Sequence, residues 1–254
     1  MKQIPNLFTL LNLVFGCLAI ISILQNGITI TTDANGLDLI VMPERIWMAS
    51  LYIGLAAMID FFDGLIARIF KASSEMGKQL DSLADLVSFG VAPGLIIYQF
   101  LRLSFAQQQD GIEISILWLI PSLILPCAAA YRLAKFNLDK NQQYSFKGLP
   151  VPAVGILIAS LPLIYWNVNE QWVINLLLNK WFLYGLVFLL SYLMVSNIPL
   201  MSFKFKNFGI KDNVPKYLLA VISIVAIVVL KWLAVPVIML AYVLVSLLFK
   251  NKIV

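Results

Sequence analysis

The chain has 254 residues, of which 61% are hydrophobic and 12% charged, and its mean hydropathy is +0.90. This composition excludes a soluble globular domain and indicates a polytopic membrane protein. The formal net charge is +5, and the sequence contains no histidine, which excludes histidine bases, Ser-His triads and histidine-ligated zinc. Because no linker or internal repeat divides the chain, we expect one all-α membrane domain over residues 1–254.

Several apolar segments have the length of a membrane-spanning helix, about 20 residues. Their lengths and spacing predict a polytopic helical membrane protein with about eight transmembrane helices and both termini in the cytoplasm. The predicted spans are 6–26, 46–69, 78–104, 114–136, 150–167, 180–200, 214–230 and 232–249, with the least certain boundary at Lys231.

The distribution of basic residues supports this topology. With both termini in the cytoplasm, 14 of the 18 Lys and Arg residues fall on the cytoplasmic side, and only Arg45, Arg102, Lys180 and Lys231 remain outside. Short cytoplasmic loops are enriched in Lys and Arg, so the asymmetry favours an even number of spans. The positive charge therefore describes the inner membrane face. No nucleic-acid motif gives it another meaning.

Four aspartates lie within 26 residues at the predicted cytoplasmic face. Asp60 and Asp63 are three residues apart, and Asp81 and Asp85 are four apart, so each pair shares one face of a helix. Two antiparallel helices would bring all four carboxylates together. Such carboxylates cannot all stay ionised without cations, and an all-oxygen ligand set favours Mg²⁺, Mn²⁺ or Ca²⁺ over zinc.

Residues beside the aspartates indicate the chemistry. Gly64 and Ala67 leave the helix backbone accessible, and Arg68 can pair with a phosphate. Together with a divalent metal, these features indicate phosphoryl transfer. The alternatives are loop acids paired with Arg68, Lys71 and Lys78, or a cation-coupled membrane transporter. Neither broken helices nor related halves, which are frequent in transporters, are evident in this sequence.

The window from Asp60 to Asp85 follows the pattern D-x2-D-G-x2-A-R-x8-G-x3-D-x3-D. This pattern resembles the signature of the CDP-alcohol phosphatidyltransferases. The resemblance implies an integral membrane enzyme, a homodimer in a prokaryotic cytoplasmic membrane, whose active site faces the cytoplasm. It also implies two divalent ions, Mg²⁺ or Mn²⁺, and transfer of a phosphatidyl group from a CDP-linked lipid to an alcohol, with release of CMP.

The resemblance assigns roles to the fixed positions of the pattern. The four aspartates would bind the metals, and Asp85 would also be the general base that takes the proton of the acceptor hydroxyl. The residues that would line the cytidine-diphosphate pocket are Gly64, Ala67, Arg68 and Gly77.

The first predicted span carries polar residues at three-residue intervals, Asn6, Thr9 and Asn12, which we expect to face the protein interior. One interpretation is hydrogen bonding between membrane helices. The segment also resembles the one that precedes the aspartate pattern in bacterial and archaeal phosphatidylserine synthases. That resemblance implies that Asn6 and Thr9 contribute to nucleotide binding.

Basic residues near the predicted fourth and fifth spans bear on the acceptor. Arg132, Lys135 and Lys147 could bind an acceptor carboxylate or a lipid phosphate, or serve as positive-inside anchors. The run from Arg132 to Asn137 followed by Gly148-Leu149-Pro150 resembles phosphatidylserine synthases, although Lys135 stands where we expect Arg. The resemblance, which covers about residues 1–160, implies CDP-diacylglycerol and L-serine as substrates. Glycerol 3-phosphate and inositol phosphate are alternative acceptors, and the extra helices at about 180–250 carry no signature.

Overall fold

The computed structural model describes residues 4–32, 38–69, 74–107, 114–138, 146–201, 209 and 213–249. Within these ranges, the side chains of residues 4, 38–39, 66–69 and 146–147 are not among the described ones. Within these limits the chain is helical apart from two short antiparallel ribbons, which confirms the all-α class.

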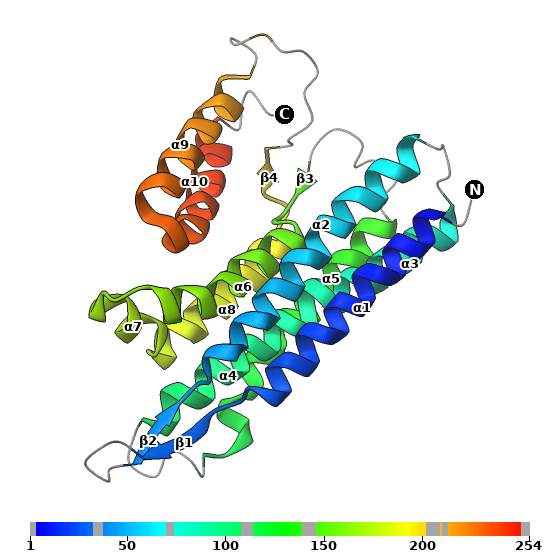
Figure 1. Cartoon of the computed structure of the whole chain (residues 1–254). Helices are drawn as coiled ribbons and strands as arrows, with labels where there is room; N and C mark the ends of the chain where they lie inside the picture. The colour runs from blue at the N-terminus through cyan, green and yellow to red at the C-terminus, as the bar shows by residue number, and fades with distance from the viewer. Residues whose placement is uncertain are drawn as a thin grey trace.

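Helices α1 (Ile4–Gln25) and α2 (Trp47–Ile69) lie side by side and run in opposite directions (Figure 1). The connection between them contains a ribbon of β1 (Thr29–Thr32) and β2 (Asp38–Val41), whose register pairs Ile30 with Ile40. The loop that follows the first span thus has secondary structure that the apolar pattern did not predict.

The third span is one long helical run with a local change of pitch. Helix α3 (Glu75–Asp85) passes through a π-helical turn (Leu86–Val91) into α4 (Ala92–Ala106). Its first turn is capped by Ser74, whose Oγ accepts a hydrogen bond of 2.9 Å from the Gly77 N–H. The wide turn begins directly after Asp85, and such turns occur frequently at functional sites.

The second half of the bundle consists of shorter helices. These are α5 (Ile124–Leu138), α6 (Val151–Asn167), α7 (Gln171–Leu177) and α8 (Lys180–Val195). Helices α7 and α8 meet at an angle of 65°. The bend follows from the Asn179 side chain, which caps α8 by accepting hydrogen bonds from the Trp181 and Phe182 N–H groups.

A second ribbon joins the segment before α6 to the segment after α8. Strands β3 (Phe146–Lys147) and β4 (Pro199–Leu200) are antiparallel, with Lys147 opposite Pro199. Gly148 follows with a φ of 74° and donates its N–H to the Ile198 carbonyl at 2.9 Å. A Cβ at Gly148 would lie 2.6 Å from the Met194 carbonyl oxygen, so this turn requires glycine.

The C-terminal helices form a hairpin. Helices α9 (Val214–Leu230) and α10 (Ala234–Leu248) pack side by side, and the chain reverses at Lys231, whose φ is 49° (Figure 1). The predicted boundary between the last two apolar segments at Lys231 is therefore confirmed.

The membrane character of the chain is confirmed, but the expected count of eight spans is not. Among the described residues, four helical segments are long and apolar enough to cross a membrane, or five if α7 and α8 form one bent span. Helices α5 and α6 have 15 and 17 residues. At 1.5 Å per residue they extend about 22–26 Å, less than a hydrocarbon core of about 30 Å. Helices α9 and α10 together make up one of these four segments, although the chain reverses between them.

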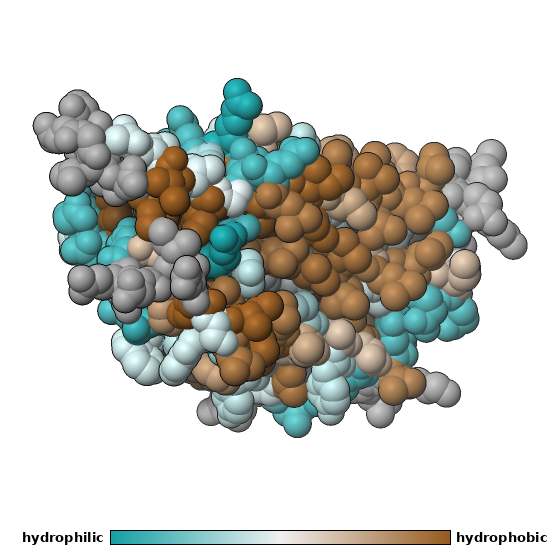
Figure 2. All heavy atoms as spheres, turned by 90° about the horizontal axis from the view of Figure 1, so that it is seen from below, coloured by the Kyte–Doolittle hydropathy of each residue, from teal (hydrophilic) through white to brown (hydrophobic). Residues whose placement is uncertain are grey.

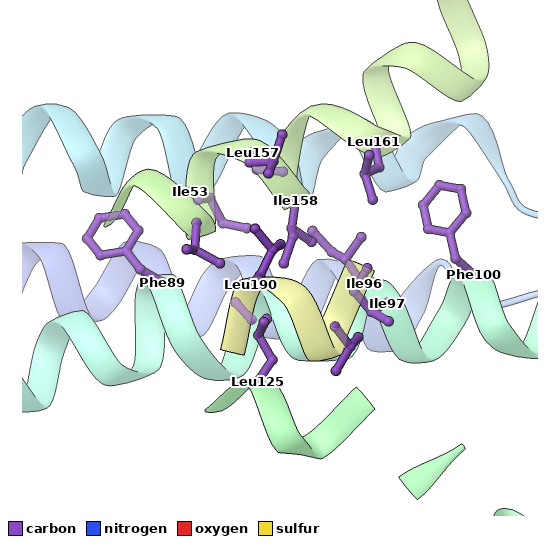
Figure 3. Close-up of a cluster of buried hydrophobic side chains, with 14 of the residues drawn as sticks. Ile53, Phe89, Ile96, Ile97, Phe100, Leu125, Leu157, Ile158, Leu161 and Leu190 are labelled. Atoms are coloured by element: carbon purple, nitrogen blue, oxygen red, sulfur yellow. The ribbon is translucent and has the colours of Figure 1, made fainter. Parts of the chain in front are cut away.

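The core lies where α2, α4, α5, α6 and α8 meet, and Figure 3 shows Ile53, Ile96, Leu125, Ile158 and Leu190 pointing towards one another. Glycine allows a close approach within this core: a Cβ at Gly155 in α6 would lie 2.8 Å from the Cβ of Phe89. The outer surface is also apolar. Figure 2 shows a wide hydrophobic area across one face, with hydrophilic residues mainly at its margins, as expected for a surface covered by lipid.

Candidate active site

Three of the four aspartates converge as the spacing predicts. One carboxylate oxygen each from Asp60 and Asp63 on α2 and from Asp81 on α3 lie within 4.8 Å of one another. Three negative charges at this separation repel one another strongly unless a cation lies between them. Their oxygens are the ligands that Mg²⁺ and Mn²⁺ prefer, so these residues fit a divalent metal site.

The fourth aspartate lies deeper. Asp85 is one turn beyond Asp81, is 7% exposed, and has Asp60 and Asp81 as electrostatic neighbours. Its Oδ1 accepts a hydrogen bond of 3.3 Å from Asn12 Nδ2. Asp85 is therefore next to the group of three, on the side that faces the protein interior.

Helix α1 supports the acidic site through its polar stripe. Thr9 Oγ1 donates a hydrogen bond of 2.9 Å to Asp63 Oδ2, while Asn12 donates to Asp85. Thr9 and Asn12 are 4% and 0% exposed, which confirms that they face the interior. Hydrogen bonding between helices, one of the two interpretations of the stripe, is thus correct, and its partners are the site's own carboxylates.

The close packing of α1 against the π-helical turn depends on Gly16. A Cβ at Gly16 would lie 2.4 Å from Ser88 Oγ, so a larger residue would force the two helices apart. Ser88 Oγ also donates a hydrogen bond of 3.1 Å to the Asn12 carbonyl. Glycine at this position therefore sets the distance between Asn12 and Asp85.

A cavity of about 480 Å³ opens beside the carboxylates. This cavity is lined by four of the residues that the sequence assigns to nucleotide binding. They are Asn6 and Thr9 on α1, Gly64 on α2 and Gly77 on α3. A Cβ at Gly64 would meet no atom within 4 Å, so the α2 backbone is accessible from the cavity. The expected pocket residues Ala67 and Arg68 have side chains outside the described residues. The other lining residues are Pro5, Asp63, Ser74, Glu75, Lys78 and Asp81.

Besides Pro5, three lining residues were not assigned to the site from the sequence: Ser74, Glu75 and Lys78. The available signal was helix capping, because a serine followed by an acidic residue marks the start of a helix. Ser74 indeed begins α3, which directs Glu75 and Lys78 of the first turn towards the cavity.

The basic residues expected to contact the acceptor fall in different places. Arg132 is 8% exposed, has Asp85 as an electrostatic neighbour, and its Nε has no hydrogen-bond partner among the described residues. Lys135 Nζ instead donates a hydrogen bond of 2.9 Å to Asn197 Oδ1. The side chain of Lys147 lies outside the described residues. Of the two whose side chains are described, Arg132 is the one that lies near the aspartates.

Asn137 connects α5 to the helix that carries Asp81 and Asp85. Its Nδ2 donates a hydrogen bond of 2.9 Å to Ser82 Oγ, and its carbonyl accepts one of 3.0 Å from Lys78 Nζ. These bonds attach α3 to α5, in addition to its contact with α1. No spacing pattern in the sequence indicates this contact.

Comparison with known proteins agrees with this geometry. The CDP-alcohol phosphatidyltransferase family model matches residues 2–192, and the chain belongs to this family. The match favours an enzyme over the transporter considered from the sequence.

Three relatives are called CDP-diacylglycerol–serine O-phosphatidyltransferase. The relative from Bacillus subtilis is 33% identical over 210 residues, which cover 80% of this chain and 93% of the relative. One from Helicobacter pylori is 36% identical over 166 residues, covering 65% of each chain. One from Mycobacterium bovis is 32% identical over 233 residues, covering 87% of this chain and 76% of the relative.

Proposed function

We propose that this enzyme transfers the phosphatidyl group of CDP-diacylglycerol to the hydroxyl of L-serine, forming phosphatidylserine and releasing CMP. The observation that carries the proposal is the convergence of Asp60, Asp63 and Asp81 within 4.8 Å beside a cavity of about 480 Å³. The names of the three relatives support serine as the acceptor.

The aspartates would hold Mg²⁺ or Mn²⁺, as two ions. When bound, such ions neutralise the charge of a pyrophosphate and of the departing CMP. The chain's own contribution is to orient the ligands: Thr9 fixes one oxygen of Asp63, and the α1–α3 contact fixes Asp85. Asn6, Gly64, Ala67, Arg68 and Gly77 would line the nucleotide pocket, which the open α2 backbone at Gly64 supports.

Asp85 would act as the general base, and its burial beside the group of three supports this role. Its carboxylate takes the proton from the serine hydroxyl, and the serine oxygen forms a bond to the lipid-side phosphorus. The bond from that phosphorus to the bridging oxygen breaks, and CMP leaves with the electron pair. The hydrogen bond from Asn12 to Oδ1 orients the Asp85 carboxylate.

Arg132 would bind the carboxylate of the serine acceptor. A buried guanidinium is costly without an anion, and the unpartnered Nε beside Asp85 supports a ligand there. Binding of an acceptor carboxylate or a lipid phosphate by Lys135 and Lys147 stays a prediction from the sequence. We further propose a homodimer in a prokaryotic cytoplasmic membrane, with the active site at the cytoplasmic face.

The test is CMP release by purified protein with Mn²⁺ or Mg²⁺, CDP-diacylglycerol and a panel of acceptors. We expect release with L-serine. Release with glycerol 3-phosphate or inositol phosphate but not serine would contradict the serine assignment and leave the family chemistry intact. Asp85→Asn should abolish turnover, and undiminished turnover would refute the base assignment.

A further inference from the structure

The C-terminal hairpin of α9 and α10 lies beyond residue 192, where the family match ends. Much of its surface is apolar and exposed, as expected for helices in lipid. Its buried polar residues are more informative, because polar groups in a membrane helix are retained where they have a specific partner.

Two such residues on α10 bind the same backbone position. Tyr242 Oη donates a hydrogen bond of 2.9 Å to the Met201 carbonyl, and Ser246 Oγ accepts one of 3.1 Å from the Met201 N–H. Tyr242 and Ser246 are four residues apart, on one face of α10, and all three residues are buried, at 5%, 0% and 2% exposed. We call these two hydrogen bonds the Met201 contact.

The Met201 contact lies directly after β4, which pairs with β3. Figure 1 shows the end of α10 near these two strands. The same stretch is bonded to the elements of the site: the Ile198 carbonyl accepts from the Gly148 N–H, and Asn197 accepts from Lys135 on α5. A helix that fixes Met201 therefore also fixes the segment that holds the end of α5.

Tyr242 also lies close to the site itself, because it is an electrostatic neighbour of Arg132. Arg132 in turn has Asp85 as a neighbour. Tyr242 is thus connected to the basic side of the site in two ways. It lies near Arg132, and its hydroxyl holds Met201.

We propose that Tyr242 and Ser246 are positioning residues for the acceptor, and that the C-terminal hairpin is part of the catalytic unit rather than only a membrane anchor. Through the Met201 contact, α10 holds the β3–β4 ribbon and the α5 end, and so keeps Arg132 in the orientation that binds the acceptor carboxylate. This inference rests on the proposed function, since Arg132 acts on the acceptor only if the chain performs the proposed transfer.

The test is steady-state kinetics of Tyr242→Phe and Ser246→Ala in the full chain. Each variant should raise KM for L-serine about fivefold, the change expected for one buried hydrogen bond, with KM for CDP-diacylglycerol unchanged. Ser223→Ala is the matched control, because among the described residues Ser223 Oγ bonds the Leu219 carbonyl of its own helix and no other group. Tyr192→Phe, at an exposed tyrosine on α8, controls for the loss of a hydroxyl. Both controls should leave the two KM values unchanged.

A double-mutant cycle separates positioning from general stability. Tyr242→Phe combined with Arg132→Lys should be non-additive in kcat/KM for serine, because both changes act through one guanidinium. Additive effects, or equal changes in the KM values of both substrates, would overturn the inference. If Tyr242→Phe fails to fold, Ser246→Ala carries the same measurement. If the wild-type enzyme uses another alcohol, the KM comparison is made with that alcohol, so failure of the serine assignment is distinguished from failure of the positioning role.

Discussion

Neutralising Asp81 should stabilise the metal-free protein while destroying its response to metal. Two unit charges 4.8 Å apart repel by about 3.5 kcal/mol at an effective dielectric constant of 20, and Asp81→Asn removes two such pairs from the group of three. Asp81 is partly exposed, so we take about a third of this sum after solvent screening, about 2 kcal/mol. For a chain of this size that corresponds to a rise in Tm of roughly 4–8 °C in EDTA.

In the presence of metal, the wild-type protein should be more stable than Asp81→Asn. A wild-type protein at a Mn²⁺ concentration 100 times Kd gains about 2.7 kcal/mol, whereas Asp81→Asn should gain little. Transferase activity of the variant should fall roughly 100-fold or more, as for loss of a principal electrostatic group. The assay is thermal unfolding in detergent with EDTA or Mn²⁺, alongside CMP release.

Glu170→Gln is the matched control, because it makes the same carboxylate-to-amide change at the exposed start of α7, far from the acidic group in the sequence. It should leave the Mn²⁺-dependent shift in Tm and the activity unchanged. A lower Tm for Asp81→Asn in EDTA, or a metal-dependent shift as large as that of the wild type, would refute the assignment of Asp60, Asp63 and Asp81 as a metal site.

Three further substitutions test the supports of the site. Gly16→Ala places a Cβ 2.4 Å from Ser88 Oγ and should lower the free energy of unfolding by about 1–3 kcal/mol, with partial rescue by Ser88→Gly. A Tm equal to that of the wild type would contradict the close packing. Gly148→Ala adds a Cβ 2.6 Å from a carbonyl oxygen at a φ of 74°, so loss of folded protein is expected in size-exclusion chromatography, whereas a normal yield would show that the turn tolerates a side chain. Thr9→Val removes the hydrogen bond to Asp63 and should weaken Mn²⁺ affinity roughly 10- to 100-fold by titration, and unaltered affinity would exclude this support.

Much of the site follows from helical periodicity. Residues three or four apart share a helix face whatever the tertiary structure, so the pairing of Asp60 with Asp63 and of Asp81 with Asp85 was predictable, as was the inward direction of Thr9 and Asn12. The reversal at Lys231 was predictable because a charged residue interrupts two apolar runs.

The span count was less predictable because hydropathy measures composition, whereas helix length depends on where turns and caps interrupt the backbone. The Asn179 cap separates α7 from α8, which meet at 65°, and α5 begins at Ile124 rather than near residue 114. Helix α6 fills its predicted segment 150–167 but, with 17 residues, is shorter than a typical membrane span. The β3–β4 ribbon pairs strands more than 50 residues apart, which no local pattern encodes.

The sequence by itself therefore determined the membrane class, the acidic pairs and the family pattern, because each rests on residue type and on spacing within one helix. Only the tertiary structure decided which side chains from different helices meet. It brought Asn12 to Asp85, placed Arg132 beside the carboxylates while directing Lys135 to Asn197, and attached α10 to Met201. These contacts join residues 41 to 73 positions apart, and their distances are set by the packing of helices, as at Gly16 between α1 and the π-helical turn, which sequence spacing does not reveal.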